Sequence, residues 1–386
     1  MQTIKSRKIV TPSGVVSGEL HINDQGLIEA ISVKEVDQET YPNKIIMPGI
    51  IDTHNHGTMG YGLMGPIEDK ETEVKGYLTG LASQGVTSVF PTAEYAFFDA
   101  ILAVKDQALA TTKIAGIHSE GPYLNRVGEQ GVPEEKQAVD VNHLQAMIDS
   151  AKGHLKLVAI APELENAQAG IDLLNKHGIT VAYAHSDMNY AEAFEAFNNG
   201  VSVATHTANV MSGIHHRNMG GLGACLLHPD VMCELIPDGL HVSVEMMELM
   251  LKVKDFDKWM LISDTISASG APQGEYSFGN FTITINEEGF SKSETGRLMG
   301  STKPVIYGMN VLNKNLGLDL ITLSKLASSN VADYYKLDKT GSIEVGKYAD
   351  LIIVDDNFEL EHTYVDGNIV YSKVDNKDLF NPNFGK

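Results

Sequence analysis

Short runs of apolar residues recur through the middle of the chain, and each is followed by a stretch with helical periodicity. Residues 190–197, Tyr-Ala-Glu-Ala-Phe-Glu-Ala-Phe, illustrate the helical stretches. Strands that alternate with helices indicate parallel β–α units. The apolar runs predict eight strands, at residues 45–56, 87–92, 113–120, 155–163, 180–187, 201–209, 231–242 and 259–265.

Eight β–α units over about this length are typical of a (β/α)8 TIM barrel. A doubly wound open sheet is the alternative architecture. No glycine-rich fingerprint follows the first predicted strand, which counts against a dinucleotide-binding fold. We therefore predict the α/β class, with a barrel domain at residues 47–341.

The sequence pattern at the two ends of the chain differs from that of the middle. Residues 1–46 alternate short strand-like pieces with turns, and residues 349–371 contain two more such pieces with an Asp-Gly-Asn turn at 366–368. The ends therefore predict one small β-sandwich domain, built from residues 1–46 and 342–386.

Composition narrows the range of partners. The 386 residues suffice for a barrel plus a smaller domain, and the 50 acidic residues outnumber the 29 basic ones, for a net charge of −21. This charge argues against nucleic acid and anionic membranes as partners. No apolar run is long enough to span a membrane.

Cysteine usage and the N-terminal residues predict a cytoplasmic protein. Cys225 and Cys233 stand in apolar surroundings outside any Cys-x-x-Cys arrangement, so we expect two reduced thiols. The first residues contain no apolar signal core.

Two histidines, His54 and His56, stand one residue apart at the end of the first predicted strand. Side chains at i and i+2 of a strand share a face, so the pair can hold one cation. Imidazole nitrogen suits Zn, Fe, Ni and Cu.

Further potential ligands stand at other strand ends, where TIM-barrel enzymes build their sites. One such histidine is commonly structural, but coincidence is improbable for the whole set. Beyond the first strand, the set comprises His118 and Glu120, His185, His206, Asp238 and His241, and Asp264. His118 lies two residues before Glu120 on the same face, which allows it to support the ligands from behind.

These residue types favour metal-assisted hydrolysis. Imidazoles and a carboxylate bind a divalent cation, which lowers the pKa of a bound water from about 16 to about 7. A carboxylate that takes the proton of the water and returns it to the leaving group completes a hydrolase. Asp264 is the candidate because the eighth strand offers no other such group, and no Gly-x-Ser-x-Gly elbow indicates a serine hydrolase.

With these residues in place, the chain resembles the amidohydrolase superfamily. Pro-Gly-Ile-Ile-Asp at 48–52 with His54 and His56 is similar to its first-strand signature, and residues 341–351 are similar to its return to the β domain. Within the superfamily, the chain resembles the N-acetylglucosamine-6-phosphate deacetylases. The similar pieces are residues 118–125, 184–186, 205–209, 217–220, 236–242, 263–264 and 298–301.

The resemblance implies a role for each candidate. Glu120, His185 and His206 would hold a principal divalent metal, and His54 and His56 a second, with Glu120 between them. Zinc is the first expectation, with iron, cobalt or manganese as alternatives, and Asp264 would be the acid/base. The residues implied to meet the phosphosugar substrate are Asn209, Val210, Arg217, His241, Met299 and Gly300. A homodimer is also implied, in which Arg217 or His241 reaches across the interface.

One segment departs from the family pattern. The family usually has Gly-x-His shortly after its Glu-Gly-Pro motif, whereas residues 126–133 contain no histidine. Either Gln130 substitutes for it or the loop is rearranged, so the sugar specificity is less firmly implied than the reaction.

Several alternatives remain open. The nearest is a deacetylase of another N-acyl amino-sugar phosphate, such as N-acetylgalactosamine 6-phosphate. A cyclic-amide hydrolase would want a lysine at the end of the fourth strand, which reads Ala-Pro-Glu at 161–163, and an adenosine-deaminase-like enzyme has no use for Glu120. A barrel that binds without catalysis predicts broken ligands, whereas every ligand position and Asp264 is filled.

Overall fold

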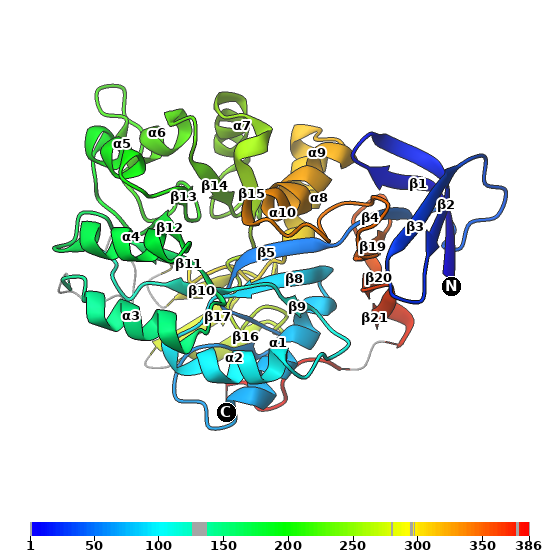
Figure 1. Cartoon of the computed structure of the whole chain (residues 1–386), viewed down its shortest axis with the longest axis horizontal. Helices are drawn as coiled ribbons and strands as arrows, with labels where there is room; N and C mark the ends of the chain where they lie inside the picture. The colour runs from blue at the N-terminus through cyan, green and yellow to red at the C-terminus, as the bar shows by residue number, and fades with distance from the viewer. Residues whose placement is uncertain are drawn as a thin grey trace.

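The computed structural model describes residues 2–125, 137–278, 281–293, 296, 298–375 and 378–385. Parallel strands with helices packed around them occupy most of the molecule, and a largely antiparallel sheet lies at one end (Figure 1). That sheet contains strands from both ends of the chain, which lie side by side in blue and red.

The parallel strands form two hydrogen-bonded groups. One is a six-stranded half-barrel in sequence order: β10 (Ile117–Glu120), β11 (Leu155–Ile160), β12 (Thr180–Tyr183), β13 (Val203–Ala204), β14 (Met232–Leu235) and β15 (Trp259–Leu261). The other contains β5 (Ile50–Asn55), β8 (Val86–Pro91) and β9 (Lys113–Ile114).

Hydrogen bonds connect the two groups on both sides. A parallel bridge joins Thr92, after β8, to His118 of β10. On the other side, the backbone N–H of Asp264, after β15, donates to the carbonyl of His54 at 2.9 Å. The carboxyl ends of strands from both groups therefore meet around one centre.

Helices follow most of the parallel strands, and several of them begin at a residue whose side chain caps the helix. In α5, Asn189 and Glu192 form a reciprocal capping box that satisfies free backbone N–H groups at the helix start. The helices are α1 (Lys70–Ala82), α2 (Phe98–Lys105), α3 (Val141–Ser150), α4 (Ala167–Lys176), α5 (Tyr190–Asn198), α6 (Gly220–Leu227), α7 (Val244–Val253), α8 (Val305–Leu316), α9 (Leu320–Ser324) and α10 (Asn330–Tyr335), with a π-helical segment, Lys325–Ser329, between the last two. Short 3-10 turns cover Tyr95–Phe97, Phe256–Lys258 and Lys373–Asp375.

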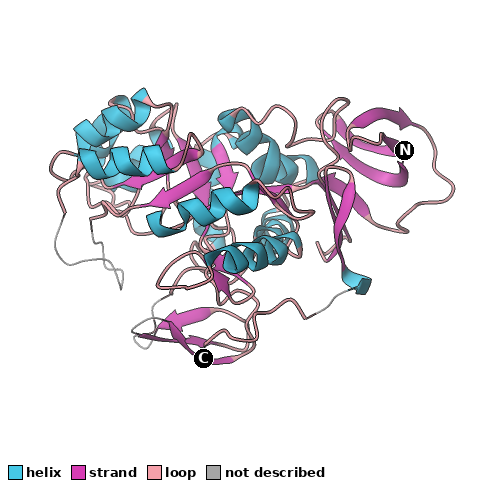
Figure 2. Ribbon diagram, turned by 60° about the horizontal axis from the view of Figure 1, so that its bottom comes forward, coloured by secondary structure: helices cyan, strands magenta, loops and turns pink. Residues whose placement is uncertain are grey.

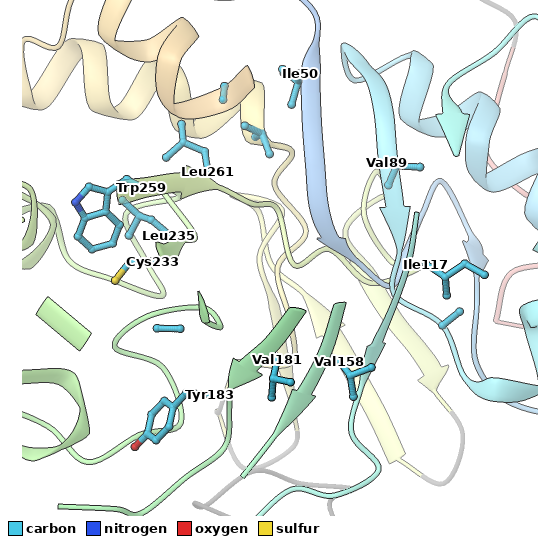
Figure 3. Close-up of a cluster of buried hydrophobic side chains, with 14 of the residues drawn as sticks. Ile50, Val89, Ile117, Val158, Val181, Tyr183, Cys233, Leu235, Trp259 and Leu261 are labelled. Atoms are coloured by element: carbon cyan, nitrogen blue, oxygen red, sulfur yellow. The ribbon is translucent and has the colours of Figure 1, made fainter. Parts of the chain in front are cut away.

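The strands bury apolar side chains on both faces. Val158, Val181 and Trp259 belong to the core between strands and helices (Figure 3). Their alternating neighbours point to the inside and form a second cluster, which includes Ile51, Phe90, Leu157, Ala159, Ala182, Val203, Met232 and Met260. This alternation follows from the two-residue period of a strand. The inner cluster is the floor beneath the carboxyl ends of the strands.

The sheet at the end of the molecule has seven strands in the order β21-β20-β19-β4-β1-β2-β3. Its strands are β1 (Gln2–Thr11), β2 (Gly14–Ile22), β3 (Ile28–Val33), β4 (Ile45–Pro48), β19 (Leu351–Val354), β20 (Leu360–Val365) and β21 (Asn368–Ser372). Residues of six of these strands, among them Ile4, Leu20, Ile46 and Ile353, form one buried cluster. Burial of this shared apolar face joins the two ends of the chain.

Two small antiparallel sheets do not pair with the strands of the larger sheets. One contains β16 (Gly274–Phe278), β17 (Phe281–Ile285) and β18 (Ser291–Ser293), and the other β6 (Gly57–Thr58) and β7 (Tyr61–Gly62). Figure 2 places the carboxyl end of the chain beside the hairpin β16–β17, where the rings of Tyr276 and Phe384 contact each other.

Several predicted strands are shorter or divided in the structure. The run 45–56 becomes β4 and β5, which belong to different sheets and meet at Gly49. A side chain at Gly49 would overlap that of Thr87, so the crossing requires a glycine. The runs 201–209 and 231–242 pair only over β13 and β14 because their later residues leave the sheet. No helix among the described residues is long and apolar enough to cross a bilayer.

Candidate metal centre

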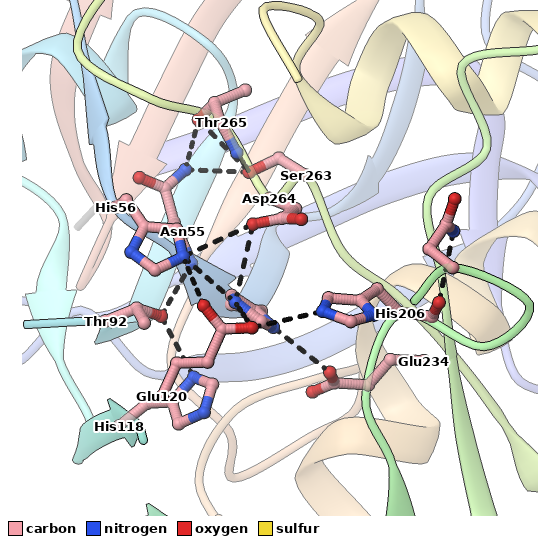
Figure 4. Close-up of polar contacts among 12 residues, drawn as sticks. Asn55, His56, Thr92, His118, Glu120, His206, Glu234, Ser263, Asp264 and Thr265 are labelled. Atoms are coloured by element: carbon pink, nitrogen blue, oxygen red, sulfur yellow. Dashed lines mark hydrogen bonds and ion pairs between the residues drawn. The ribbon is translucent and has the colours of Figure 1, made fainter. Parts of the chain in front are cut away.

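Six of the predicted ligands converge where the parallel strands end. They form two groups of three, each with its ligand atoms within 4.8 Å of one another: His54, His56 and Asp264, and Glu120, His185 and His206. His54 and Glu120 lie on β5 and β10, and the other four residues lie just beyond strand ends. Figure 4 shows His56, Glu120, His206 and Asp264 of this set gathered together. Residues from five different strand ends thus share one centre.

The carboxylate of Glu120 lies between the two groups. Its Oε1 is 3.1 Å from Nε2 of both His185 and His206. Its other oxygen, Oε2, is 3.1 Å from Nε2 of His56. One carboxylate therefore offers an oxygen to each group, as a ligand shared by two cations would.

The donor atoms fit divalent cations. The Nε2 atoms of His54 and His56 are 3.2 Å apart, as are those of His185 and His206. Each pair has room for a single shared proton, whereas two imidazole lone pairs directed at one point suit a metal. Oδ1 of Asp264 completes the first group, 3.4 Å from Nε2 of both His54 and His56.

The electrostatics keep both acidic ligands ionised. Burial by itself raises the pKa of Asp264, but His54 and His56 outweigh burial and hold that pKa at about 2. Burial likewise opposes a charge on Glu120, yet the surrounding imidazoles hold its pKa well below the usual range. Burial lowers the pKa of His56, and Asp264 and Glu120 more than reverse this, to about 9. Two buried carboxylates thus carry negative charge where a cation would lie.

Three ligands have left-handed backbone conformations. The φ angles of His185, His206 and Asp264 are 47°, 30° and 49°. Such values are uncommon for residues with a Cβ, and they concentrate at functional sites. At each position the chain turns away from the strand direction as its side chain enters the centre.

A buried polar network holds the first group in place. Asp52 accepts hydrogen bonds from the hydroxyl of Ser263 at 2.6 Å and from Nδ2 of Asn55 at 3.2 Å. Asn55 also donates to the hydroxyl of Thr265 at 2.7 Å. These contacts fix the end of β5 to both residues that flank Asp264.

Other side chains support the ligands from behind. Nδ1 of His118 lies 2.9 Å from the hydroxyl of Thr92, and its ring packs edge-on against that of His54 with centroids 4.6 Å apart. Burial lowers the pKa of His118 well below its ordinary value, so this imidazole is neutral. Glu234 lies on the opposite side, with Oε2 3.3 Å from Nδ1 of His54.

The residues expected to bind substrate occupy varied environments. Asn209 donates from Nδ2 to the carbonyl of His206 at 3.1 Å, so it lies directly behind a ligand. Nδ1 of His241 is 2.7 Å from Asp238 Oδ2. Arg217 is exposed, with its guanidinium 2.7 Å from Nε2 of His216.

The remaining substrate candidates lie in less polar surroundings or outside the described residues. Met299 packs against the cluster that contains Ile266. Gly300, with φ of 58°, precedes Ser301, whose N–H donates to the carbonyl of Asp264 at 2.9 Å. Val210 also has a left-handed backbone, with φ of 49°. Gln130 falls outside the described residues.

Two carboxylates, the buried Glu234 and the half-buried Glu163, have no role predicted from the sequence. Glu163 accepts from Nδ2 of Asn125 and from the hydroxyl of Ser186, both at 2.7 Å, and so connects the loops after β10 and β12. Glu234 can be noticed in the sequence, since it is the one charged residue in the apolar run 231–236. A carboxylate in a strand buried on both faces requires a partner.

Comparison with known proteins places these residues in a family. Residues 45–370 match the model of the amidohydrolase family. N-acetylglucosamine-6-phosphate deacetylase of Vibrio furnissii is 30% identical over 368 residues, which cover 94% of this chain and 90% of that protein. N-acetylgalactosamine-6-phosphate deacetylase of Escherichia coli O157:H7 is 27% identical over 376 residues, which cover 95% and 98% respectively.

A solved structure extends the likeness to the fold. The crystal structure of N-acetylglucosamine-6-phosphate deacetylase from Thermotoga maritima is 29% identical and superposes with a TM-score of 0.83. The match covers 96% of this chain and 100% of that one. The family model spans the whole metal centre and all of the parallel strands, so the chain belongs to the amidohydrolase family.

Proposed function

We propose that this chain deacetylates N-acetylglucosamine 6-phosphate, releasing glucosamine 6-phosphate and acetate with the help of a divalent metal. The observation that carries the proposal is the carboxylate of Glu120 between two groups of imidazoles, with Asp264 at the same centre. The relatives that cover nearly the whole chain are deacetylases of N-acetyl amino-sugar phosphates.

In this proposal Glu120, His185 and His206 hold the principal metal, and His54 and His56 hold a second one beside Asp264. Zinc is the first candidate, and iron, cobalt or manganese would suit the same donors. When bound, the metal supplies Lewis-acid chemistry that polarises the amide carbonyl and makes water more acidic.

Asp264 acts as the proton shuttle. Its ionised carboxylate accepts a proton from the attacking water, which supplies the oxygen of the new C–O bond. The same carboxyl group then returns the proton to the sugar nitrogen as the C–N bond breaks. Backbone hydrogen bonds from Asp264 to His54 and from Ser301 to Asp264 hold this residue at the centre through both transfers. The side-chain hydrogen bond from Asn55 to Thr265 holds its neighbour.

The substrate phosphate is held by Arg217, with Asn209, Val210 and His241 contacting phosphate or sugar. Met299 and Gly300 line the sugar, and Gln130 takes the place of the family histidine. Capture by a few oriented donors solves the problem of binding an anion to a chain of net charge −21. Because Arg217 is exposed on its own chain, we also propose a homodimer in which it serves the neighbouring site.

The architecture we propose is a (β/α)8 barrel at residues 47–341 that carries the centre, with a small β-sandwich domain from residues 1–46 and 342–386. The inner cluster, to which strands on both sides of the β8–β10 bridge contribute, supports closure of the barrel. The cluster shared by six strands of the terminal sheet supports its curling into a sandwich. The reduced state of buried Cys225 and Cys233 supports a cytoplasmic location.

Deacetylation of N-acetylgalactosamine 6-phosphate is the second candidate function, favoured by the Escherichia coli relative. A protein that binds without catalysis is the non-enzymatic alternative. Acetate release from N-acetyl hexosamines, with and without the 6-phosphate, distinguishes the three. We expect release from N-acetylglucosamine 6-phosphate foremost. Faster release from the galactose epimer, or none from any sugar by metal-loaded protein, would overturn the proposal.

A further inference from the structure

We propose that Glu234 is a positioning residue that orients His54 as a metal ligand. Metal binding by the His54–His56–Asp264 group would then depend on Glu234. This inference rests on the proposed metal centre. The proposed reaction does not use Glu234, although its side chain lies on the inner face of the strands beside the ligands.

Glu234 lies on β14 with none of its side chain exposed. Met232, two residues earlier, belongs to the inner cluster, whereas Cys233 and Leu235 belong to the outer core. The alternation of a strand therefore directs Glu234 inward, directly above Met232. Figure 4 shows its carboxylate pointing toward the ligands.

Both carboxylate oxygens of Glu234 are engaged. The hydroxyl of Thr53 donates to Oε1 at 2.9 Å, and Nδ1 of His54 lies 3.3 Å from Oε2. A carboxylate accepts hydrogen bonds, so Nδ1 of His54 carries a proton, and Nε2 is the nitrogen that would bind a metal. That Nε2 is the atom 3.2 Å from His56 and 3.4 Å from Asp264.

Glu234 is therefore placed to orient a ligand and not to be one. Its contact is with the Nδ1 edge of His54, whereas the other donor atoms gather at the Nε2 edge. The ring of His118 packs edge-on against the same imidazole. A carboxylate behind a ligating histidine sets the tautomer and raises the basicity of the coordinating nitrogen.

Within the part of the chain that the structure describes, the second group of ligands lacks such support. Nδ1 of His185 and Nδ1 of His206 are both buried without a hydrogen-bond partner among the described residues. Loss of Glu234 should therefore weaken one metal position selectively. A general structural role for Glu234 predicts equal loss at both positions.

The test is Zn²⁺ affinity of the full chain, measured by competition with a chromophoric chelator in two backgrounds. His185→Ala leaves the His54 group intact, and His56→Ala leaves the Glu120 group intact. We expect Glu234→Gln to lower the affinity about 10- to 100-fold in the first background. In the second background the affinity should be unchanged. Glu73→Gln, which alters a half-buried carboxylate on α1 that accepts from Gly62 N–H, is the matched control for both.

A milder substitution tests the same contact with less risk that the chain misfolds. Thr53→Val removes the donor to Oε1 alone, so it should give a smaller loss with the same selectivity, and no further loss once Glu234→Gln is present. Long-range ¹H–¹⁵N spectra of the metal-free chain should show the Nδ1-protonated signal of His54 weakened by Glu234→Gln.

Equal losses in both backgrounds, no loss in the His185→Ala background, or no Zn²⁺ bound there with Glu234 present would each overturn the inference. None of these measurements uses substrate. Failure of the deacetylase proposal is seen separately, in the acetate assay.

Discussion

Asp264 occupies a position in which a ligand and an acid/base are hard to tell apart. Its Oδ1 is equally close to His54 and His56, so the carboxylate belongs to the first ligand group by geometry. If it is the proton shuttle, Asp264→Asn should lower the rate of acetate release by roughly 10²–10⁴ because the amide cannot carry the proton. Metal content and turnover should be measured in the same preparation.

The shuttle hypothesis and the ligand hypothesis predict different metal contents for Asp264→Asn. A shuttle variant retains its metal and still binds substrate. Loss of metal together with activity, and recovery of the rate on adding metal, would show that Asp264 is a ligand only.

Arg217 is the residue whose proposed role depends most on charge. Loss of a charge-assisted bidentate contact with phosphate costs about 1.5–3 kcal/mol, which corresponds to roughly 10- to 160-fold in kcat/KM. We expect Arg217→Ala to cause this loss with N-acetylglucosamine 6-phosphate and to leave slow turnover of N-acetylglucosamine nearly unchanged. Equal losses on the two sugars would contradict a phosphate contact.

The candidate ligands could be singled out from the sequence because each stands at the end of an apolar run typical of a buried strand. His54, Glu120 and His185 needed no tertiary information beyond the rule that sites form at strand ends. Glu234 stands out as the one charged residue of its apolar run, but its contacts with Thr53 and His54 could not be predicted because those residues are about 180 positions away. The environment of Arg217 could not be predicted either, since a loop conformation depends on its neighbours.

At the level of elements, an ion-pair cluster connects the parallel strands to the terminal sheet. Nζ of Lys113, at the start of β9, lies 2.7 Å from Asp350 and 2.6 Å from Asp366, which flank β19 and β20. Asp350 is 4% exposed and also accepts from the hydroxyl of Thr340. Removal of the lysine leaves a buried carboxylate without its charged partner.

Lys113→Met should therefore lower the free energy of unfolding by about 1–3 kcal/mol, less than for a fully buried pair because the lysine is 29% exposed. Lys8→Met, which removes an exposed pair with Asp356, is the control and should cost no more than about 1 kcal/mol. Urea denaturation of both variants measures the difference. Similar costs for the two would mean that the Lys113 cluster is no stronger than a surface pair.

The same cluster has a predictable pH dependence. Burial lowers the pKa of Lys113, but Asp350 and Asp366 outweigh it and raise the pKa above its ordinary value. The folded state thus holds this proton more tightly, so the stabilisation is complete below about pH 10.4 and is lost as pH rises through the raised pKa. The stability gap between wild type and Lys113→Met should be constant from pH 6 to 9 and narrow above that range.

The type and order of the helices and strands were predicted better than their boundaries. The order of strands and helices through the middle of the chain followed from alternating apolar runs and amphipathic stretches. The division of 45–56 at Gly49 did not, because each half begins with two isoleucines and only the tertiary structure assigns the halves to different sheets. The sheet β16–β18 was not predicted, since its strands alternate with many polar residues.

For the molecule as a whole, the metal centre should be a source of stability. A cation that binds only the folded chain stabilises it by about 2.7 kcal/mol at a free concentration of 100 times its Kd. Dialysis against a chelator should therefore lower Tm, and Zn²⁺ should restore it in a concentration-dependent way. The double variant His56→Ala/His185→Ala should have a Tm that does not respond to Zn²⁺, and a response of wild-type size would place the binding elsewhere.

The pairing of β4 with β19 also has a consequence for the newborn chain. About 300 residues separate these neighbouring strands, so a ribosome working at roughly 5–20 residues per second needs on the order of 15–60 s to deliver the second after the first. Throughout that interval the strands β1 to β4 expose an open edge, which invites pairing with other chains. Chains that stop before residue 351 leave that edge bare, so such shortened products are expected to aggregate even when every metal ligand has already been made.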